Sequence, residues 1–240
     1  MGMGRSRTAR AVASVCILLL FRAPGITQEH DPPAVIRLVD AAVAARFENI
    51  LGFTDVEHYA VYRGGDETHP VAEMTVRDTY KKGVGKSYAV LSQSGSSILL
   101  HFGFKPLLEN EQTINQPGNI EKSWFNSANY AMTLKDDIVQ KLNGRDCLAL
   151  QVKPRQVAPN LIIGTIWVDA HDGTLGQIDG VASKNPSAFS GATRLMRQYA
   201  NIDGYSMAIH ARAESDSALF GRTIVTIDYS DYKLEIKARK

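Results

Sequence analysis

The sequence has little cysteine, and this scarcity limits the class of protein. The 240 residues contain two cysteines. Cys16 lies in an N-terminal apolar run that we expect to be removed, so Cys147 remains alone. One cysteine excludes an intramolecular disulfide and a cysteine-rich zinc site. The remaining chain must therefore be stabilised by an ordinary core, for which its length and its 44% of hydrophobic residues are sufficient.

The sequence also lacks an excess of basic charge. The whole chain carries 27 basic and 25 acidic residues. Residues 1–28 contain four arginines (Arg5, Arg7, Arg10 and Arg22) and no acid, so the remainder has 23 basic and 25 acidic residues. The formal net charge thereby changes from +2 to −2. No basic stripe remains that would indicate nucleic-acid binding.

The N-terminus has the pattern of a secretory signal peptide. The basic stretch "MGMGRSRTAR" is followed by the apolar run "AVASVCILLLF" and then by the polar, turn-forming stretch "RAPGITQEHDPP". The apolar run is shorter than the roughly 20 residues that span a bilayer comfortably. We expect a signal peptide over 1–27, cleaved near Gly25 to Gln28, followed by a single domain over 28–240. A signal anchor is the alternative interpretation.

Motifs of catalysis and of metal or cofactor binding are missing. "GVGKS" (Gly83 to Ser87) lacks the first glycine of a P-loop, because Tyr80 occupies that position, and a strand-like stretch follows it. "QSGSS" (Gln93 to Ser97) lacks the flanking glycines of a nucleophile elbow, and Ser94 or Ser96 is better interpreted as a helix N-cap. The six histidines form no H-E-x-x-H pattern. We therefore predict no enzyme, no metal site and no cofactor, although a triad assembled in space stays open as an alternative.

The stretch "GTIWVDAHDGTLGQIDG" (Gly164 to Gly180) poses the same choice between catalysis and structure. Its three aspartates do not have calcium-loop spacing, because His171 and Gly173 occupy the third and fifth positions counted from Asp169. Two short alternating segments flank "AHDG", and Asp–Gly favours a tight turn. The stretch predicts a β-hairpin with Asp172–Gly173 at its tip.

One long helix is expected near the start of the mature chain. Residues 31–53 have apolar side chains at helical spacing, with Asp31 as N-cap, prolines in the first turn and Gly52 at the C-cap position. The residues expected to pack under a sheet are Val35, Ile36, Val39, Val43 and Phe47, and Ile50 continues this face.

The rest of the chain is dominated by alternation with a period of two. Strands are predicted over 73–80, 87–92, 145–154, 205–213 and 223–236, with a hairpin turn at 81–86. In the last strand the apolar parity switches near Ser230–Asp231, which indicates a bulge. Residues 95–128 do not alternate and predict short helices and loops. The fold class is α+β, with a curved antiparallel sheet covered on one face by helices.

The order of these signatures resembles the periplasmic LolA/LolB-like superfamily, in particular bacterial outer-membrane lipoprotein-sorting proteins. It comprises "YAVYRGG", "SYAVLSQSG", "FKPLLENE", "SANYAMTL", "LALQVKPR", the hairpin just described, "NPSAF", "YANIDGYSMA" and "GRTIVTIDYSDY". The resemblance implies a half-closed antiparallel barrel with a helical lid, an apolar cavity for acyl chains, and a periplasmic location. It also implies an arginine that holds the lid, and no arginine of this chain matches that position.

These observations lead to one function and two rivals. The main hypothesis is a non-enzymatic periplasmic carrier that holds the acyl chains of a lipid or lipoprotein, with membrane proteins as its partners. The rivals are an envelope sensor or adaptor that binds another protein, and a secreted hydrolase. For each candidate cavity or lid residue, ordinary core packing is the alternative, and Trp167 faces either the cavity or a helix. The candidates are Phe102, Phe104, Leu107, Leu108, Trp124, Phe125, Tyr130 and Trp167.

Overall fold

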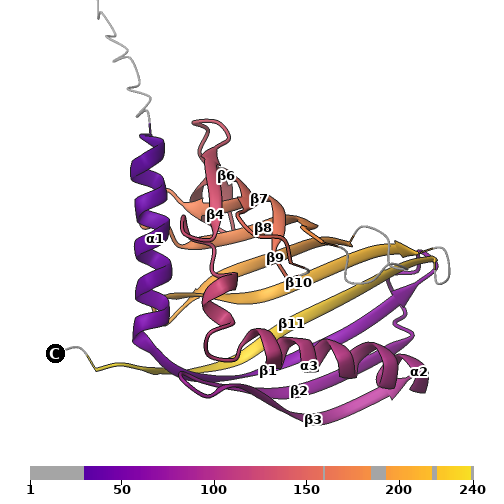
Figure 1. Ribbon diagram of the computed structural model, residues 1–240. Coiled ribbons are helices and arrows are strands. Elements are labelled where there is room, and N and C mark those ends of the chain that lie inside the picture. Colours follow the sequence, from indigo (N-terminus) through magenta and orange to yellow (C-terminus); the bar gives the residue numbers. More distant parts are fainter. Residues whose placement is uncertain (1–29, 159, 185–192, 218–220, 239–240) are drawn as a thin grey trace, which may run out of the picture.

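A long curved sheet, open at both edges, forms the body of the protein (Figure 1). The computed structural model describes residues 30–158, 160–184, 193–217 and 221–238. The predicted signal peptide (1–27) and the "NPSAF" segment (185–189) lie outside these residues. The helical elements are α1 (Pro32–Asn49), α2 (Ser97–Leu99), the π-helical turn η1 (Leu100–Phe104), α3 (Lys105–Ile114) and the 3-10 helix η2 (Ile120–Ser123).

The strands account for most of the remaining residues. They are β1 (Ile50–Arg63), β2 (Ala72–Lys81), β3 (Gly85–Gly95), β4 (Tyr130–Leu134), β5 (Gln140–Leu142), β6 (Arg145–Pro154), β7 (Ile162–Asp169), β8 (Leu175–Ala182), β9 (Thr193–Ile202), β10 (Tyr205–Ser217) and β11 (Gly221–Ile236). The predicted strands and the helical segment between β3 and β4 are confirmed. So is the N-cap, because the Ser96 side chain accepts a hydrogen bond from the Leu99 backbone N–H.

All strand pairs are antiparallel, in the order β3-β2-β1-β11-β10-β9-β8-β7-β6-β4, and β5 pairs with β6. The first and last strands of this path do not meet, so the sheet is not closed. The long central pair β1–β11 contains the predicted bulge. Its register shifts between Thr54 and Val56, opposite Asp231, whose φ is 55°.

Helix α1 is shorter than the sequence predicted. It ends at Asn49, and Ile50 to Phe53 belong to β1 instead. Phe53 pairs with Tyr80 on one side and Leu234 on the other, so these residues gain sheet hydrogen bonds with two strands at once. In a helix, the backbone N–H groups of these residues could bond only to the carbonyls of the preceding turn. Gly52 is therefore no helix cap, and a Cβ there would lie 2.9 Å from the carbonyl oxygen of Tyr80.

Helix α1 and the α2–α3 segment cover the same face of the sheet (Figure 1). Strand register supports this view: Ile227 of β11 pairs with Ala211, which pairs with Arg197, which pairs with Ile178 of β8. Directly paired residues point to the same side of a sheet. Ile227 packs in the apolar cluster near α3, and Ile178 packs in the cluster near α1. We call this side the covered face.

The stretch from Gly164 to Gly180 is the predicted hairpin, formed by β7 and β8. Its aspartates serve the turn, since Asp169 accepts hydrogen bonds from the backbone N–H groups of His171 and Asp172. The tip also contacts α1. A Cβ on Gly173, whose φ is +72°, would lie 2.4 Å from the carbonyl carbon of Leu38.

Replacing Gly173 with alanine is expected to lower the free energy of unfolding by about 2–3 kcal/mol, because it combines backbone strain with a clash against α1. Gly204 is a matched control, since its φ is +88° and, among the described residues, nothing lies within 4 Å of where its Cβ would stand. Gly204→Ala should cost only the backbone strain, about 1 kcal/mol. Urea unfolding of both variants tests this, and equal losses would show that the hairpin tip does not support α1.

Candidate functional site

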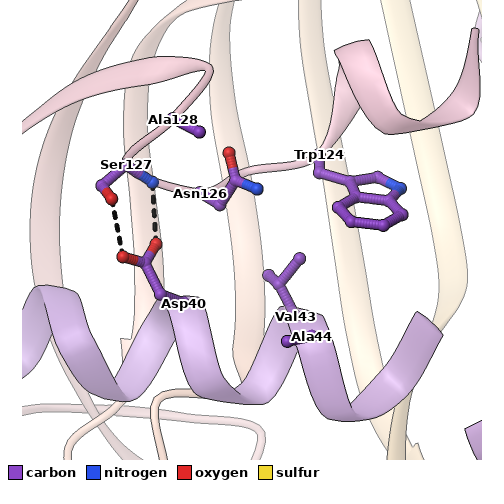
Figure 2. A pocket seen from close by; sticks show the side chains of 7 residues that line it. All are labelled: Asp40, Val43, Ala44, Trp124, Asn126, Ser127 and Ala128. Carbon is purple, nitrogen blue, oxygen red and sulfur yellow. Dashed lines mark hydrogen bonds between the residues drawn. The ribbon is translucent and has the colours of Figure 1, made fainter. Parts of the chain in front are cut away.

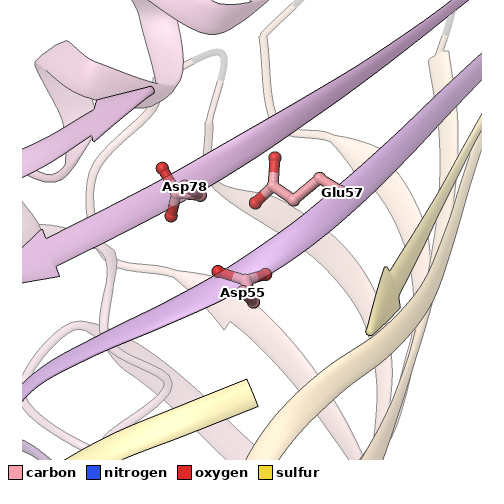
Figure 3. A group of neighbouring side chains, drawn as sticks. All are labelled: Asp55, Glu57 and Asp78. Carbon is pink, nitrogen blue, oxygen red and sulfur yellow. The ribbon is translucent and has the colours of Figure 1, made fainter. Parts of the chain in front are cut away.

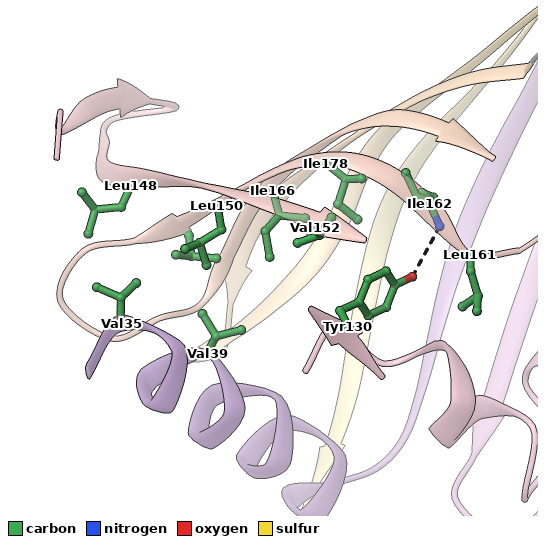
Figure 4. Packing of buried hydrophobic residues seen from close by; sticks show 11 residues of the cluster. Val35, Val39, Tyr130, Leu148, Leu150, Val152, Leu161, Ile162, Ile166 and Ile178 are labelled. Atoms are coloured by element: carbon green, nitrogen blue, oxygen red, sulfur yellow. Dashed lines mark hydrogen bonds between the residues drawn. The ribbon is translucent and has the colours of Figure 1, made fainter. Parts of the chain in front are cut away.

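Two apolar clusters lie on the covered face, one beneath each helical cover. The α1 cluster is shown in Figure 4. Its buried members are Val35, Val39, Tyr130, Leu148, Leu150, Val152, Leu161, Ile162, Ile166, Val168 and Ile178. The α3 cluster consists of Tyr59, Val61, Ala72, Met74, Val76, Phe104, Leu108, Ala211 and Ile227.

The predicted lid residues fall in and around the α3 cluster. Phe104 and Leu108 are buried in it, and the ring of Phe104 meets the ring of Tyr59 edge-on at 5.9 Å. Leu107 packs against the cluster and is partly buried. Phe102, in contrast, is 73% exposed. The segment is thus amphipathic in its contacts, with one side on the sheet and Phe102 directed to solvent.

Of the predicted aromatic residues, three lie near α1 and the fourth lies on the opposite face of the sheet. Tyr130 is buried in the α1 cluster and stacks on Phe125 with ring centroids 4.8 Å apart. Trp124 stacks on Phe47 of α1 at 4.2 Å. Trp167 is separate from this set, because its neighbours Ile166 and Val168 point to the covered face and strand alternation directs Trp167 to the opposite one.

A shallow pocket opens between α1 and the segment before β4 (Figure 2). Its volume is about 220 Å³, and it is lined by Asp40, Val43, Ala44, Trp124, Asn126, Ser127 and Ala128. Asp40 accepts hydrogen bonds from the backbone N–H of Ser127 at 2.7 Å and from its hydroxyl at 2.6 Å. This carboxylate holds the segment on the helix, and the apolar side of the pocket is formed by Val43, Ala44 and Trp124.

A group of charged side chains that sequence reasoning missed lies next to the α3 cluster. We call it the acid–lysine cluster; it consists of Asp55 and Glu57 of β1, Asp78 of β2, Lys86 of β3 and Glu111 of α3. Figure 3 shows the first three acids gathered from two neighbouring strands. Asp55, Glu57 and Asp78 are each only 2% exposed.

Lys86 is the cation at the centre of this cluster. Its Nζ lies 2.7 Å from a Glu57 carboxylate oxygen, 3.2 Å from Asp78 and 3.3 Å from Glu111. The Tyr59 hydroxyl donates a further short hydrogen bond to Glu57. Burial alone would lower the pKa of Lys86, but Glu111, Glu57 and Asp78 raise it well above its ordinary value. The lysine is therefore a permanent positive charge at neutral pH.

The aspartates of the cluster are less well compensated. Burial, reinforced by the charge of Glu57, raises the pKa of Asp55 to about 7. Burial also raises the pKa of Asp78 to about 6, although Lys86 opposes the shift. Within the described part of the chain, neither Asp55 oxygen makes a hydrogen bond of normal geometry. Asp55 is accordingly the weakest point of the cluster.

The three acids from β1 and β2 have the donor set of a metal site, with ligand oxygens within 4.8 Å of one another. The Lys86 ammonium, however, already lies against Glu57 and Asp78. Its positive charge neutralises part of the charge that would attract a metal ion. We therefore interpret the cluster as an internal ion network.

Glu111 connects this network across the concave side of the sheet. One of its oxygens faces Lys86 of β3 at 3.3 Å, and the other faces Arg197 of β9 at 3.8 Å. Four strands separate β3 from β9, which in a flat sheet would place them roughly 24 Å apart. Both bases reach one carboxylate only because the sheet curves strongly. We call Glu111 with Lys86 and Arg197 the Glu111 latch.

The covered face is thus divided rather than uniformly apolar. The resemblance implied one apolar interior, whereas the acid–lysine cluster on β1 to β3 borders the α3 cluster, and Arg197 of β9 lies between the strands of the α3 cluster and those of the α1 cluster. A ligand on this face therefore meets both apolar surface and polar groups. Fold and site together define an open antiparallel half-barrel with helical covers and an amphipathic interior.

Comparisons with known proteins find similar structures but no similar sequence family. No protein-family model matches the sequence, and no curated protein matches it. Solved structures do match. A DUF1329 family protein from Desulfovibrio piger is 14% identical with a TM-score of 0.45, covering 88% of this chain and 96% of that chain.

Two further structures are similar to this chain. A LolA superfamily protein from Nitrosomonas europaea is 12% identical with a TM-score of 0.42, covering 87% of this chain and 96% of that chain. A domain described as an outer membrane lipoprotein-sorting protein from Vibrio parahaemolyticus is 14% identical with a TM-score of 0.47, covering 85% and 94%. In the described parts of the chain, no helix has the length and apolar character needed to cross a membrane.

Proposed function

We propose that this chain is a non-enzymatic periplasmic carrier that shields the acyl chains of a lipid or lipoprotein on its covered face. The observation that carries the proposal is the way the α2–α3 segment covers the α3 cluster. It places two large buried side chains, Phe104 and Leu108, on an otherwise apolar sheet surface. Its polar attachment to the sheet is the Glu111 latch.

Such a cover is suited to exchange with an acyl chain. When the segment lifts, the apolar surface of Tyr59, Val61 and Met74 loses its partner. An acyl chain that replaces the segment regains about 0.8 kcal/mol for each buried CH₂ group. A chain of ordinary length therefore offsets the loss of the lid contacts. The predicted signal peptide supports a periplasmic location, and membrane proteins that donate or accept the cargo are the expected partners.

Native mass spectrometry of residues 28–240, purified from periplasm and extracted in parallel with organic solvent, tests the carrier. We expect an added mass that extracts as lipid. Leu107→Glu should reduce it at least about tenfold, because a charge placed beside the α3 cluster disfavours burial of an acyl chain. Phe102→Glu is the matched control in the same segment and should retain the lipid, since Phe102 is 73% exposed. A clean apo mass that persists after incubation with lipid vesicles would contradict the carrier.

One observation favours an adaptor that binds another protein as a second candidate. Strand β3 is an edge strand, and the chain from Ser87 to Leu100 carries no charged residue. Beside it, Ile98 and Phe102 are 68% and 73% exposed. Long uncharged edges invite the addition of a strand from another chain. If the parent protein carries no lipid and Phe102→Glu abolishes copurification of a partner protein, the adaptor is favoured over the carrier.

A further inference from the structure

Arg46 is a base on the covered side that no acid of the described residues neutralises. It lies in the last turn of α1 and reaches over the start of β10. Its Nε donates to the carbonyl of Ser206 at 3.1 Å, and one terminal nitrogen lies 3.6 Å from the Met207 sulfur. The guanidinium also lies 4.9 Å from the ring centroid of Phe47. Most of its five N–H donors are thus left for another acceptor.

Other bases in comparable positions are neutralised within the protein. Lys86 faces three carboxylates, Arg197 faces Glu111, and Arg145 bonds to Asp169 at 3.1 Å. Arg46 forms no ion pair in the part of the chain that the structure describes. Burial lowers the pKa of Arg46, and the phenol groups of Tyr199, Tyr232 and Tyr80 only partly offset this effect. A partly buried charge without a counter-charge is costly, and an anion would remove the cost.

Phenol groups and an indole belong to the surroundings of Arg46. Tyr199, Tyr232 and Tyr80 contribute to its electrostatic environment, and the Tyr232 hydroxyl already donates to the carbonyl of Ala208 at 2.8 Å. Trp124 stacks on Phe47, which in turn contacts the guanidinium. Within the described ranges its indole Nε1 is buried without a hydrogen-bond partner. A buried donor without an acceptor is a second, independent group that can donate to a ligand oxygen.

We propose that Arg46 and the Trp124 indole N–H bind the anionic headgroup of an amphiphile, through carboxylate or phosphate oxygens. This inference rests on the proposed carrier function and names the class of cargo. Trp124 also lines the pocket together with Val43 and Ala44 (Figure 2), so this indole adjoins apolar side chains of α1. The headgroup is held by charge and hydrogen bonds, and the acyl chain extends along apolar surface.

Tryptophan quenching tests the site. The chain has two tryptophans, so Trp167→Phe leaves Trp124 as the only one. In this background we expect bromine-labelled stearate to quench the fluorescence of Trp124. The uncharged methyl ester of the same acid should bind more weakly. Arg46→Gln should weaken stearate binding by about 10–100-fold, the factor that a charge-assisted hydrogen bond supplies. Arg46→Gln should leave the affinity for the ester unchanged, and Arg46→Lys should restore part of the lost affinity for stearate. A brominated monoacyl phosphate tests the phosphate headgroup in the same way.

The control is Arg37→Gln on the same helix, since the Arg37 side chain is 70% exposed. Its affinity for stearate should equal that of the parent. Thermal unfolding of each variant shows whether the fold is kept. Equal binding of acid and ester, unaffected by Arg46→Gln, overturns the headgroup site but leaves the carrier standing. Absence of quenching by every amphiphile overturns the headgroup site, and together with a clean apo mass in the native mass spectrum it overturns the carrier. Binding of inorganic phosphate alone, with no amphiphile binding, assigns the site to a free anion instead.

Discussion

Replacing Lys86 with methionine is expected to lower the free energy of unfolding by about 3–5 kcal/mol at pH 8. The change removes the cation that touches Glu57, Asp78 and Glu111 together. The acids then face one another in a site where they are largely shielded from water, and their repulsion is uncompensated. A methionine of similar volume keeps the packing, so the loss reports the charge rather than a cavity.

Urea unfolding at pH 8 and at pH 5 measures this effect. The loss should be smaller at pH 5, because protonation of the carboxylates relieves their repulsion. Lys81→Met is the matched control: Lys81 is exposed on the adjacent strand, and its replacement should change stability by no more than about 0.5 kcal/mol. A loss for Lys86→Met that is equal at both pH values would show that the lysine acts through packing alone.

The Glu111 latch adds a second consequence to this loss. Because Lys86 holds one Glu111 oxygen and Arg197 the other, removing the lysine leaves α3 attached to one side of the concave sheet. Stability and lid attachment are thus linked through one residue. In a carrier, the cover would then be held both by these ion pairs and by the apolar contacts of Phe104 and Leu108.

The sheet itself could be predicted from the sequence to a large extent. The one-sided alternation in Met74, Val76 and Tyr80 has a single physical cause, namely a strand with one covered face. The Ser230–Asp231 parity switch marked the bulge for the same reason. Patterns of this kind can be recognised in the sequence because they depend only on residues two positions apart.

The beginning of β1 could not be predicted in this way. Ile50 to Phe53 continue the apolar spacing of α1, and only pairing with β2 and β11, distant in sequence, makes them a strand. The acid–lysine cluster was missed for a related reason. Lys86 lies within the hairpin turn predicted at 81–86, and Asp55 and Asp78 become neighbours only through strand register. Charges that compensate one another across strands carry no periodic signal along the chain.

The candidate site was accordingly predictable only in its apolar part. Phe104, Leu108 and Tyr130 are dense, large and apolar, and the structure buries all three on the covered face. Whether they contact a ligand stays a prediction. Arg46 gave no signal, because a single arginine near the end of an amphipathic helix is ordinary until its surroundings are known. Its significance comes from the absence of a carboxylate beside it in the described structure.

Replacing Asp55 with asparagine is expected to stabilise the protein at pH 8, by up to about 4 kcal/mol, and to change little at pH 4. The Asp55 pKa is about 7 in the folded protein, above its usual value of about 4 in an unfolded chain. The folded state therefore binds more protons than the unfolded state between pH 4 and 7. Stability of the parent protein should consequently fall as the pH rises through this window, and Asp78, with a pKa of about 6, contributes in the same direction.

Chemical unfolding of the parent and Asp55→Asn between pH 4 and 8 tests this linkage. The parent curve should descend toward pH 8, and the variant should remove most of the slope, because a neutral amide carries no desolvated charge. Asp136→Asn, at a partly buried position outside the cluster, should leave the slope unchanged. A parent protein whose stability rises from pH 4 to 8 would mean that Asp55 is ionised throughout. Lys86 would then compensate the negative charge of the whole cluster. Placing these acids on the covered face would in that case destabilise the fold far less than their burial implies.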